Sequence, residues 1–400
     1  MAAISGFAPA IETEGRQESL VLALQALSRF HAEAPARPAA GYDLISALSG
    51  NMFIVATSFG QPCPAWWILG SRAQFLEFAG QVIGLAVQPL SAPPEGLDLA
   101  GQQAFFREEM LPRIEAEIAA GRPVLARGGF PGFGWGLWGV LTRTEAGKAF
   151  GLTCWFQYSE QSVGEEFPVQ VVYAVQASDR SKRIPIREIL QHAAELYQNQ
   201  GEPGWTTGPA AYERWMDHIS NWAPCSPECA DLANCHRQMA SFVHDARMTA
   251  ARFLDFLNEE LPPTLRRYLP GIVEHNRQIT TLLRSLATSQ DPAALLGEKE
   301  GRKEFLATLA KVREHEECLG AAYAELARQR DWDAPPPKKR VRPEKAKGRR
   351  ARDEKDSERD KDKGKDRDKS REKPREEREK EREERVRAEA KARGWRKISD

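Results

Sequence analysis

The spacing of apolar residues predicts helices near the start of the chain. Residues 17–34 place most of their leucines on one side of a helix, and residues 43–59 form a second apolar segment. Ser49 and Gly50 fall in the middle of that second segment and weaken a plain helix there. We expect a helix followed by a short strand over residues 71–90.

A clearer helix leads into a group of strands. Residues 102–120 carry apolar side chains at helical spacing, and Gly121 supplies a stop. Four short segments rich in β-branched and aromatic residues follow, with turn residues between them: 123–126, 136–142, 150–156 and 167–176. Helices followed by consecutive strands indicate an α+β fold with an antiparallel sheet.

Helical spacing returns at residues 184–200, and the chain from there to residue 332 has an entirely helical pattern. The longest apolar stripe lies on one face of a predicted helix. It consists of Met239, Phe242, Val243, Ala246, Ala250, Phe253, Leu254 and Leu257. Two more helices are expected near residues 272–286 and 302–328. We expect a helical bundle packed beside, or onto, the α+β domain.

The last segment, residues 334–400, has almost no apolar side chains, so we expect it to be disordered. It holds 28 Lys and Arg against 18 Asp and Glu, which leaves residues 1–333 with 29 basic and 39 acidic side chains. The overall neutral charge therefore hides a basic tail and an acidic body. A run near its start can contact polyanions, or serve as a nuclear signal in a host with a nucleus, through Lys338, Lys339, Arg340, Arg342, Lys345, Lys347, Arg349 and Arg350.

These patterns together predict three parts: an α+β domain over residues 1–200, an all-α bundle over 201–333 and a charged tail over 334–400. Six cysteines are too sparse for a disulfide-stapled scaffold, which favours a reduced, cytoplasmic setting. The N-terminus lacks the features of a signal peptide, and no apolar run reaches the roughly 18 to 20 residues of a membrane span. We therefore expect no membrane contact.

Nucleophilic catalysis by cysteine needs a thiolate with a histidine in hydrogen-bond reach, and the predicted α+β domain is poor in histidine. Residues 1–191 contain only His31. Cys63 lies between prolines and is a candidate nucleophile, although an incidental or packing role is the simpler interpretation. Cys154 lies on an apolar strand, where core packing is favoured.

A cysteine-rich segment raises the possibility of a metal site. Cys225, Cys229, Cys235 and His236 have the spacing C-x3-C-x5-C-H, and thiolate and imidazole are suitable zinc ligands. The spacing departs from common zinc motifs, and adjacent helical residues point about 100° apart. We expect no metal and no other cofactor.

The glycine-rich segment 128–139 carries the aromatic residues Phe130, Phe133, Trp135 and Trp138. Two interpretations are open: an aromatic groove for an apolar or planar ligand, or a rigid corner whose rings pack in the core. Gly134, Gly136 and Gly139 match G-x-G-x-x-G, but no helix is expected after them, which argues against dinucleotide binding.

Four stretches, in order, carry a family resemblance: DLISALSGNMF; CPAWW; IEAEIAAGRPVLARGG with GLWGVLTRTEAGKAFGLTCW; and GPAAYERWMDHISN with CHRQMASFVHDARMTAARFL. Over residues 42–290 the chain resembles bacterial proteins related to butirosin biosynthesis protein H, whose N-terminal domain looks like a bacteriocin-processing, papain-like cysteine peptidase. The resemblance implies a papain-like cleft, with Trp66 and Trp67 joining the four aromatic residues as ligand-binding candidates.

In the family pattern a nucleophilic cysteine begins a helix near Ser49, a histidine opens the strand near Leu137 or Trp138, and an acidic or amide residue follows near Thr153. None of these residue types occurs at those positions here. The resemblance therefore implies a cleft without its triad. An imidazole would have to come from the helical domain, where His218, His236 and His244 are the candidates.

Three functions follow as hypotheses. The first is a non-catalytic binding or accessory protein whose ligand is a peptide, a carrier-protein arm or a small amine. The second is an acyltransferase or amide hydrolase with a base from the helical domain. The third is a polyanion-associated protein acting through its basic tail.

Overall fold

The computed structural model describes residues 2–8, 18–32, 41–58, 73–131, 136–154, 159–179, 184–198, 204–224 and 231–333. Met1–Lys338 group as one compact unit. No helix of the described residues is long and apolar enough to cross a membrane. The tail predicted over residues 334–400, with its eight basic candidates, lies outside the described residues.

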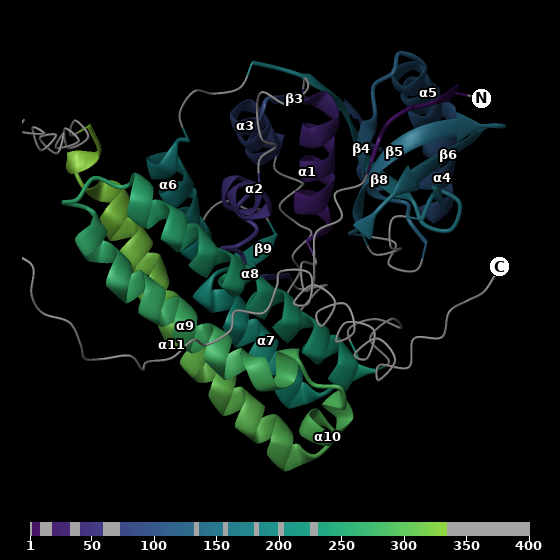
Figure 1. The fold of residues 1–400 in the computed structure, drawn as a ribbon. Helices are drawn as coiled ribbons and strands as arrows, with labels where there is room; N and C mark the ends of the chain where they lie inside the picture. Colours follow the sequence, from purple (N-terminus) through teal and green to yellow (C-terminus); the bar gives the residue numbers. More distant parts are fainter. Residues whose placement is uncertain are drawn as a thin grey trace, which may run out of the picture. The chain divides into compact units, whose positions relative to one another are not determined.

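A mixed set of helices and strands makes up the first half of this unit (Figure 1). In chain order it contains β1 Ala2–Ala3, α1 Ser19–His31, α2 Tyr42–Leu48, β2 Ala56–Ser58, α3 Ala73–Ile83, β3 Leu85–Ser91, α4 Leu99–Phe105, a π-helical segment Phe106–Met110 and α5 Leu111–Ala119. The strands β4 Val124–Gly128, β5 Trp138–Glu145, β6 Lys148–Leu152, β7 Gln161–Val163 and β8 Val169–Ala177 follow. The predicted α+β class and antiparallel sheet are confirmed.

The main sheet has the strand order β3-β8-β4-β5-β6-β7, and every pairing in it is antiparallel. β1 pairs with β5 at Ala2↔Thr144, beyond the end of the β4–β5 pairing at Val124↔Leu141. β5 and β6 form a tight hairpin through Glu145↔Lys148, where Ala146 and Gly147 have positive φ angles of 50° and 74°. The turn EAGK thus joins two neighbouring strands, as its composition indicates.

Side chains alternate between the two faces of the sheet and pack in two hydrophobic cores. Leu125, Trp138, Val140 and Tyr173 belong to a large core that also contains α1, whereas Leu141 belongs to a smaller core with residues of α5. Period-two alternation along β5 explains this division, because neighbouring residues point to opposite faces. Figure 1 shows α1 and α5 on opposite sides of these strands.

The second half of the unit is mainly helical. It contains α6 Ile186–Tyr197, β9 Trp205–Thr207, α7 Pro209–Asn221, α8 Leu232–Glu260, a 3-10 turn Arg266–Tyr268, α9 Leu269–Ala287, α10 Pro292–Leu296, α11 Lys299–Arg328 and a 3-10 turn Asp331–Asp333. The two longest helices, α8 and α11, both pack against α9. The stripe predicted for α8 is buried along its whole length.

One strand interrupts the region predicted to be entirely helical, so that prediction is wrong there. β9 pairs with β2 through Ala56↔Thr207, Thr57↔Thr206 and Ser58↔Trp205. Three residues carry too little pattern to identify a strand, and its partner lies about 150 residues earlier in the chain. The large core also contains residues of both the first and the second half.

Candidate functional site

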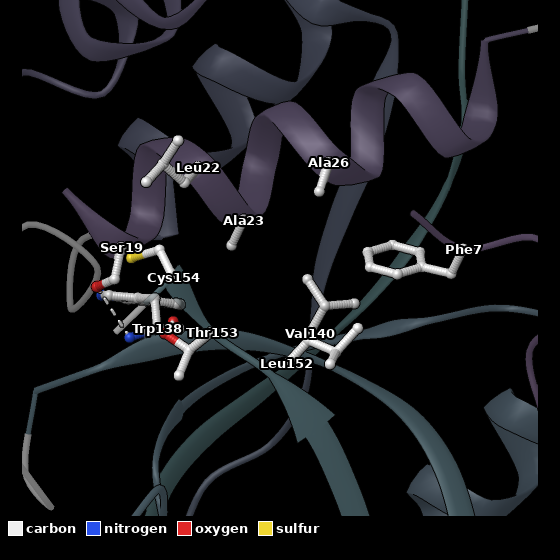
Figure 2. Close-up of a pocket in the computed structure, with 10 residues that line it drawn as sticks. All are labelled: Phe7, Ser19, Leu22, Ala23, Ala26, Trp138, Val140, Leu152, Thr153 and Cys154. Carbon is white, nitrogen blue, oxygen red and sulfur yellow. Dashed lines mark hydrogen bonds between the residues drawn. The ribbon is translucent and has the colours of Figure 1, made fainter. Parts of the chain in front are cut away.

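A pocket lies between α1 and the strands β5 and β6. Its wall on the helix side comes from Ser19, Leu22, Ala23 and Ala26 of α1, and the strand side includes Val140 of β5. Figure 2 shows Ser19, Trp138, Thr153 and Cys154 gathered at one end, and Phe7, Ala26, Val140 and Leu152 at the other. The pocket therefore has a polar end, close to the start of α1, and an apolar end.

Hydrogen bonds connect the residues of the polar end. Ser19 Oγ accepts a hydrogen bond from the Trp138 backbone N–H at 3.1 Å, and Thr153 Oγ1 donates to the Trp138 carbonyl at 2.8 Å. The Trp138 indole Nε1 is buried and has no hydrogen-bond partner among the described residues. A buried N–H without an acceptor is unusual, because such a group costs about 1 to 3 kcal/mol when unpaired.

Among the described residues that line this pocket, the cysteine is Cys154. Burial raises the pKa of its thiol to about 12; a Thr153 hydrogen bond opposes the shift, and the Glu18 carboxyl adds to it. The thiol is therefore neutral near pH 7, and a neutral thiol is a poor nucleophile. The core position expected for Cys154 agrees with its packing against the large hydrophobic core.

A buried acidic cluster sits at the residue before α1. Asn51 Nδ2 donates to Glu18 Oε2 at 3.4 Å, and the Tyr42 hydroxyl donates to Asp245 Oδ2 at 3.3 Å while accepting from the Glu18 backbone N–H. Burial, and then the charge of Asp245, raise the pKa of Glu18 well above its usual value. The Asn51 Oδ1 atom is buried and has no partner. The cluster joins the start of α1, α2, the turn after it and α8.

Ser49 has a different place from the one that the resemblance implies. It is the C-terminal cap of α2 and does not begin a helix, so that expectation is wrong. Its side chain is buried, and its hydroxyl donates to the Ser46 carbonyl at 3.4 Å. A serine hydroxyl bonded to a backbone carbonyl has no base to activate it.

The three histidine candidates lie in α7 and α8. His236 is fully buried, and its Nδ1 accepts a hydrogen bond from Trp215 Nε1 at 3.1 Å. Its ring centroid is 5.2 Å from that of His218, and burial, followed by the charge of His218, lowers the pKa of His236 to about 3. Burial also lowers the pKa values of His218 and His244. These three imidazoles are held in the neutral form by helix packing.

Of the predicted aromatic ligand contacts, Phe130 and Trp138 are described, and both are buried in the core. The Phe130 ring covers two glycines: a Cβ atom added to Gly139 would lie 2.3 Å from Phe130 Cζ, and one added to Gly151 would lie 3.3 Å from Phe130 Cε1. Phe130 thus packs as a core residue, while Trp138 lines the pocket. Phe133, Trp135, Trp66, Trp67 and Cys63 lie outside the described residues.

The metal hypothesis receives no support in the part of the chain that the structure describes, where no group of three His, Cys, Asp or Glu side chains is placed to hold an ion. Cys235 is half-buried and forms no disulfide bond with a described residue. Cys225 and Cys229 lie outside the described residues, so a metal on all three cysteines stays untested.

An ion pair that the sequence patterns did not identify lies at the centre of the helical region. Arg247 and Glu316 are buried and form two hydrogen bonds, Nε to Oε1 and Nη2 to Oε2, each of 2.9 Å. Tyr212 donates to Glu316 Oε1 at 2.8 Å, and Arg247 also donates to the carbonyls of Met52 and Phe53. We call these five residues the Arg247 cluster. It ties the turn after Ser49 to α7, α8 and α11.

The chain matches no protein-family model, and no curated protein matches its sequence.

Proposed function

We propose that the protein is a non-catalytic binding or accessory protein. The observation that carries the proposal is the state of the reactive side chains. The pocket contains a neutral, half-buried Cys154 thiol, and the Ser49 hydroxyl is bonded to a backbone carbonyl. Covalent catalysis needs an activated nucleophile next to a base, and among the described residues neither group has a base as its hydrogen-bond partner.

The position of the pocket supports a relation to a papain-like cleft. The resemblance places the family's histidine near Trp138 and its third catalytic residue near Thr153, and these two residues share a hydrogen bond at the pocket's polar end. A peptide, a carrier-protein arm or a small amine is the ligand we propose on this basis. The papain-like fold and the family assignment are part of the same proposal.

The second hypothesis, acyl transfer or amide hydrolysis with a base from the helical region, needs an imidazole beside Ser49 or Cys63. Among the described residues, the Ser49 hydroxyl donates to the Ser46 carbonyl, and His236 accepts a hydrogen bond from Trp215. No observation therefore favours this hypothesis over binding.

A panel of chromogenic esters and thioesters tests the proposal on the full-length chain. We expect no turnover above the background rate, and no difference between the natural chain and the variants Ser49→Ala, Cys63→Ala and Cys154→Ala. Robust turnover that one of these substitutions abolishes would overturn the binding proposal. Thermal unfolding of each variant shows whether a loss of turnover is instead a loss of folding.

The sequence of the tail supports a separate association with polyanions. Eight Lys and Arg occur within residues 338–350. Such a segment binds phosphates through counterion release, so we expect nucleic-acid affinity to fall steeply with added salt. Affinity that is unchanged after deletion of residues 334–400, or that is insensitive to salt, would remove this role.

A further inference from the structure

Two histidine rings meet in the helical region, where α9 and α11 pack side by side (Figure 1). His275 lies on α9 and His315 on α11. Their Nδ1 atoms are 3.0 Å apart, and their ring centroids are 5.3 Å apart. Both residues are half-buried, so the pair lies at the edge of the contact between the two helices.

The packing of the two helices fixes the distance between the histidines. Residues three before and four after a given position lie on the same face of a helix. At these positions the apolar side chains are fully buried: Ile272 and Ile279 on α9, and Val312 and Leu319 on α11. Side chains on packed helices are held more precisely than those on loops, which favours a site prepared for a ligand.

The separation of the two nitrogen atoms matches two neighbouring ligands of one metal ion. Metal–imidazole bonds are about 2.0 to 2.1 Å long, so two such nitrogen atoms are about 2.9 Å apart at a bond angle of 90° and about 3.3 Å apart at the tetrahedral angle. The observed 3.0 Å lies closer to the first distance. Square-planar or octahedral coordination, which Cu²⁺ and Ni²⁺ adopt with nitrogen ligands, has the angle of 90°.

The protonation of the pair also permits an ion to bind. As a hydrogen-bonded pair, one imidazole donates its Nδ1–H and the other accepts. With an ion on both Nδ1 atoms, each ring carries its N–H on Nε2, so a neutral pair changes tautomer and releases no proton. Burial, followed by the charge of His315, lowers the pKa of His275, while the charge of Glu274 opposes this shift. The lowered pKa favours the neutral imidazole, which is the form that binds metals.

The protein supplies two ligands at this position, and water completes the coordination. Among the described residues, no group of three His, Cys, Asp or Glu side chains is placed to hold an ion. The neighbouring carboxylate, Glu274, accepts hydrogen bonds from Arg277 and Gln278. Because the pair is half-buried, solvent reaches the remaining coordination positions.

We infer that His275 and His315 bind a divalent transition-metal ion through their Nδ1 atoms and that this ion cross-links α9 to α11. Among the ions that imidazole binds, Cu²⁺ is expected to bind most tightly, followed by Ni²⁺ and Zn²⁺, whereas Mg²⁺ prefers oxygen ligands. The site is separate from the cysteine-rich segment. The inference goes beyond the proposed binding function and does not depend on it.

Titration of the full-length chain at pH 7 tests the site with four probes: the chlorides of Cu²⁺, Ni²⁺, Zn²⁺ and Mg²⁺. Calorimetry measures the affinities for Ni²⁺, Zn²⁺ and Mg²⁺, and electron paramagnetic resonance of Cu²⁺ below one equivalent identifies its ligands. We expect Ni²⁺ and Zn²⁺ to bind and Mg²⁺ not to bind. The Cu²⁺ spectrum should show hyperfine coupling to two nitrogen atoms.

Two variants and one matched control locate the ion. His275→Gln and His315→Gln each remove one of the two protein ligands, so the affinity for Ni²⁺ should fall at least about tenfold, the loss that follows even from removing a supporting group. His31→Gln is the control, because His31 is a half-buried histidine on α1 whose ring contacts Phe30. We expect it to bind Ni²⁺ like the natural chain, and circular dichroism shows whether each variant is folded.

A stability measurement tests the cross-link between the helices. An ion that binds only the folded chain stabilises it by mass action, so Ni²⁺ should raise the unfolding temperature of the natural chain and of His31→Gln. The same addition should leave His275→Gln and His315→Gln nearly unchanged. An equal rise in all four proteins would place the ion elsewhere and overturn the inference.

Three further outcomes would overturn it. No binding of Cu²⁺, Ni²⁺ or Zn²⁺ would mean that the two histidines form a hydrogen-bonded pair only. Binding lost in Cys235→Ser but kept in the two histidine variants would place the ion at the cysteine-rich segment. A Cu²⁺ spectrum without coupling to two nitrogen atoms would reject the ligands, and this readout on the natural chain holds even if a variant fails to fold.

Discussion

The Arg247 cluster and the polar end of the pocket are both buried, but they differ in how completely their polar atoms are paired. In the cluster, two hydrogen bonds join the guanidinium to both oxygens of Glu316, and Tyr212 and two backbone carbonyls complete it. Around the start of α1, in contrast, Trp138 Nε1 and Asn51 Oδ1 are buried without partners.

This difference bears on how each region contributes to stability. Fully paired buried charges hold elements together, and they leave no atom for a ligand. Unpaired buried polar atoms reduce stability unless water or another molecule satisfies them. Four substitutions, measured by their effect on the free energy of unfolding, test this difference in pairing.

The largest effect is expected from Glu316→Ala. It leaves the Arg247 charge buried without its partner, so the free energy of unfolding should fall by about 3 to 5 kcal/mol. Urea unfolding followed by circular dichroism measures the change. Glu274→Ala is the control, because Glu274 pairs with Arg277 on the surface, and no measurable loss is expected. A small loss for Glu316→Ala would mean that water reaches the cluster.

A smaller loss is expected from Tyr212→Phe, which removes one hydrogen bond to Glu316 and keeps the ring. Hydrogen bonds to charged groups contribute about 1.5 to 3 kcal/mol, so the free energy of unfolding should fall by that amount. Tyr268→Phe is the matched control, because its hydroxyl accepts from Arg267 at the surface, and it should have little effect. Equal losses in the two variants would contradict the difference in burial.

The third effect depends on pH and comes from His236. Its pKa is about 3 in the folded chain and about 6.5 when unfolded, so only the unfolded chain binds the proton between these pH values. Its contribution to stability is complete above pH 6.5 and is lost as the pH falls, by about 1.4 kcal/mol for each pH unit. His236→Asn keeps an acceptor for Trp215 without the titration. Unfolding measured from pH 7 to pH 4 should show a shallower decrease for this variant, and identical slopes would refute the assignment.

The smallest effect is expected from Asn51→Leu, in the region around the start of α1 where buried polar atoms are unpaired. The substitution removes one hydrogen bond of 3.4 Å to Glu18, and it also removes an unpaired buried oxygen. These two effects offset each other, so the free energy of unfolding should change by less than about 1 kcal/mol. A loss as large as that of Tyr212→Phe would show that Asn51 is fully paired in the folded chain.

Local hydrophobic periodicity and turn residues predicted the long helices and the strands of the main sheet. The α8 stripe from Met239 to Leu257 is buried as those patterns predicted, and the strands β4, β5, β6 and β8 overlap the predicted segments. β9 was missed, because three residues are too few to show a period. The end of α2 at Ser49 was misplaced by the family resemblance, although Ser49 and Gly50 themselves indicated an interruption.

The residues of the pocket also differ in whether the sequence indicated them. The sequence indicated Trp138 as a ligand-binding candidate, whereas Cys154 was expected to pack in the core and Thr153 was marked only by the family resemblance. The structure brings the three together at the pocket. The sequence did not indicate Ser19, which comes from α1 and contacts Trp138 across 119 positions. Glu18 looks like an ordinary surface glutamate in the sequence, and only its packing shows that its carboxyl is buried.

The amino-acid sequence by itself determined the α+β class, the antiparallel sheet and the long amphipathic helices, because these depend on local periodicity and turn residues. Only the tertiary structure decided which polar groups are paired. Arg247 and Glu316 are 69 positions apart, and nothing in their neighbourhoods marks them as partners. Whether a buried N–H such as that of Trp138 meets an acceptor depends on chain segments that are distant in sequence, and this pairing separates the Arg247 cluster from the pocket.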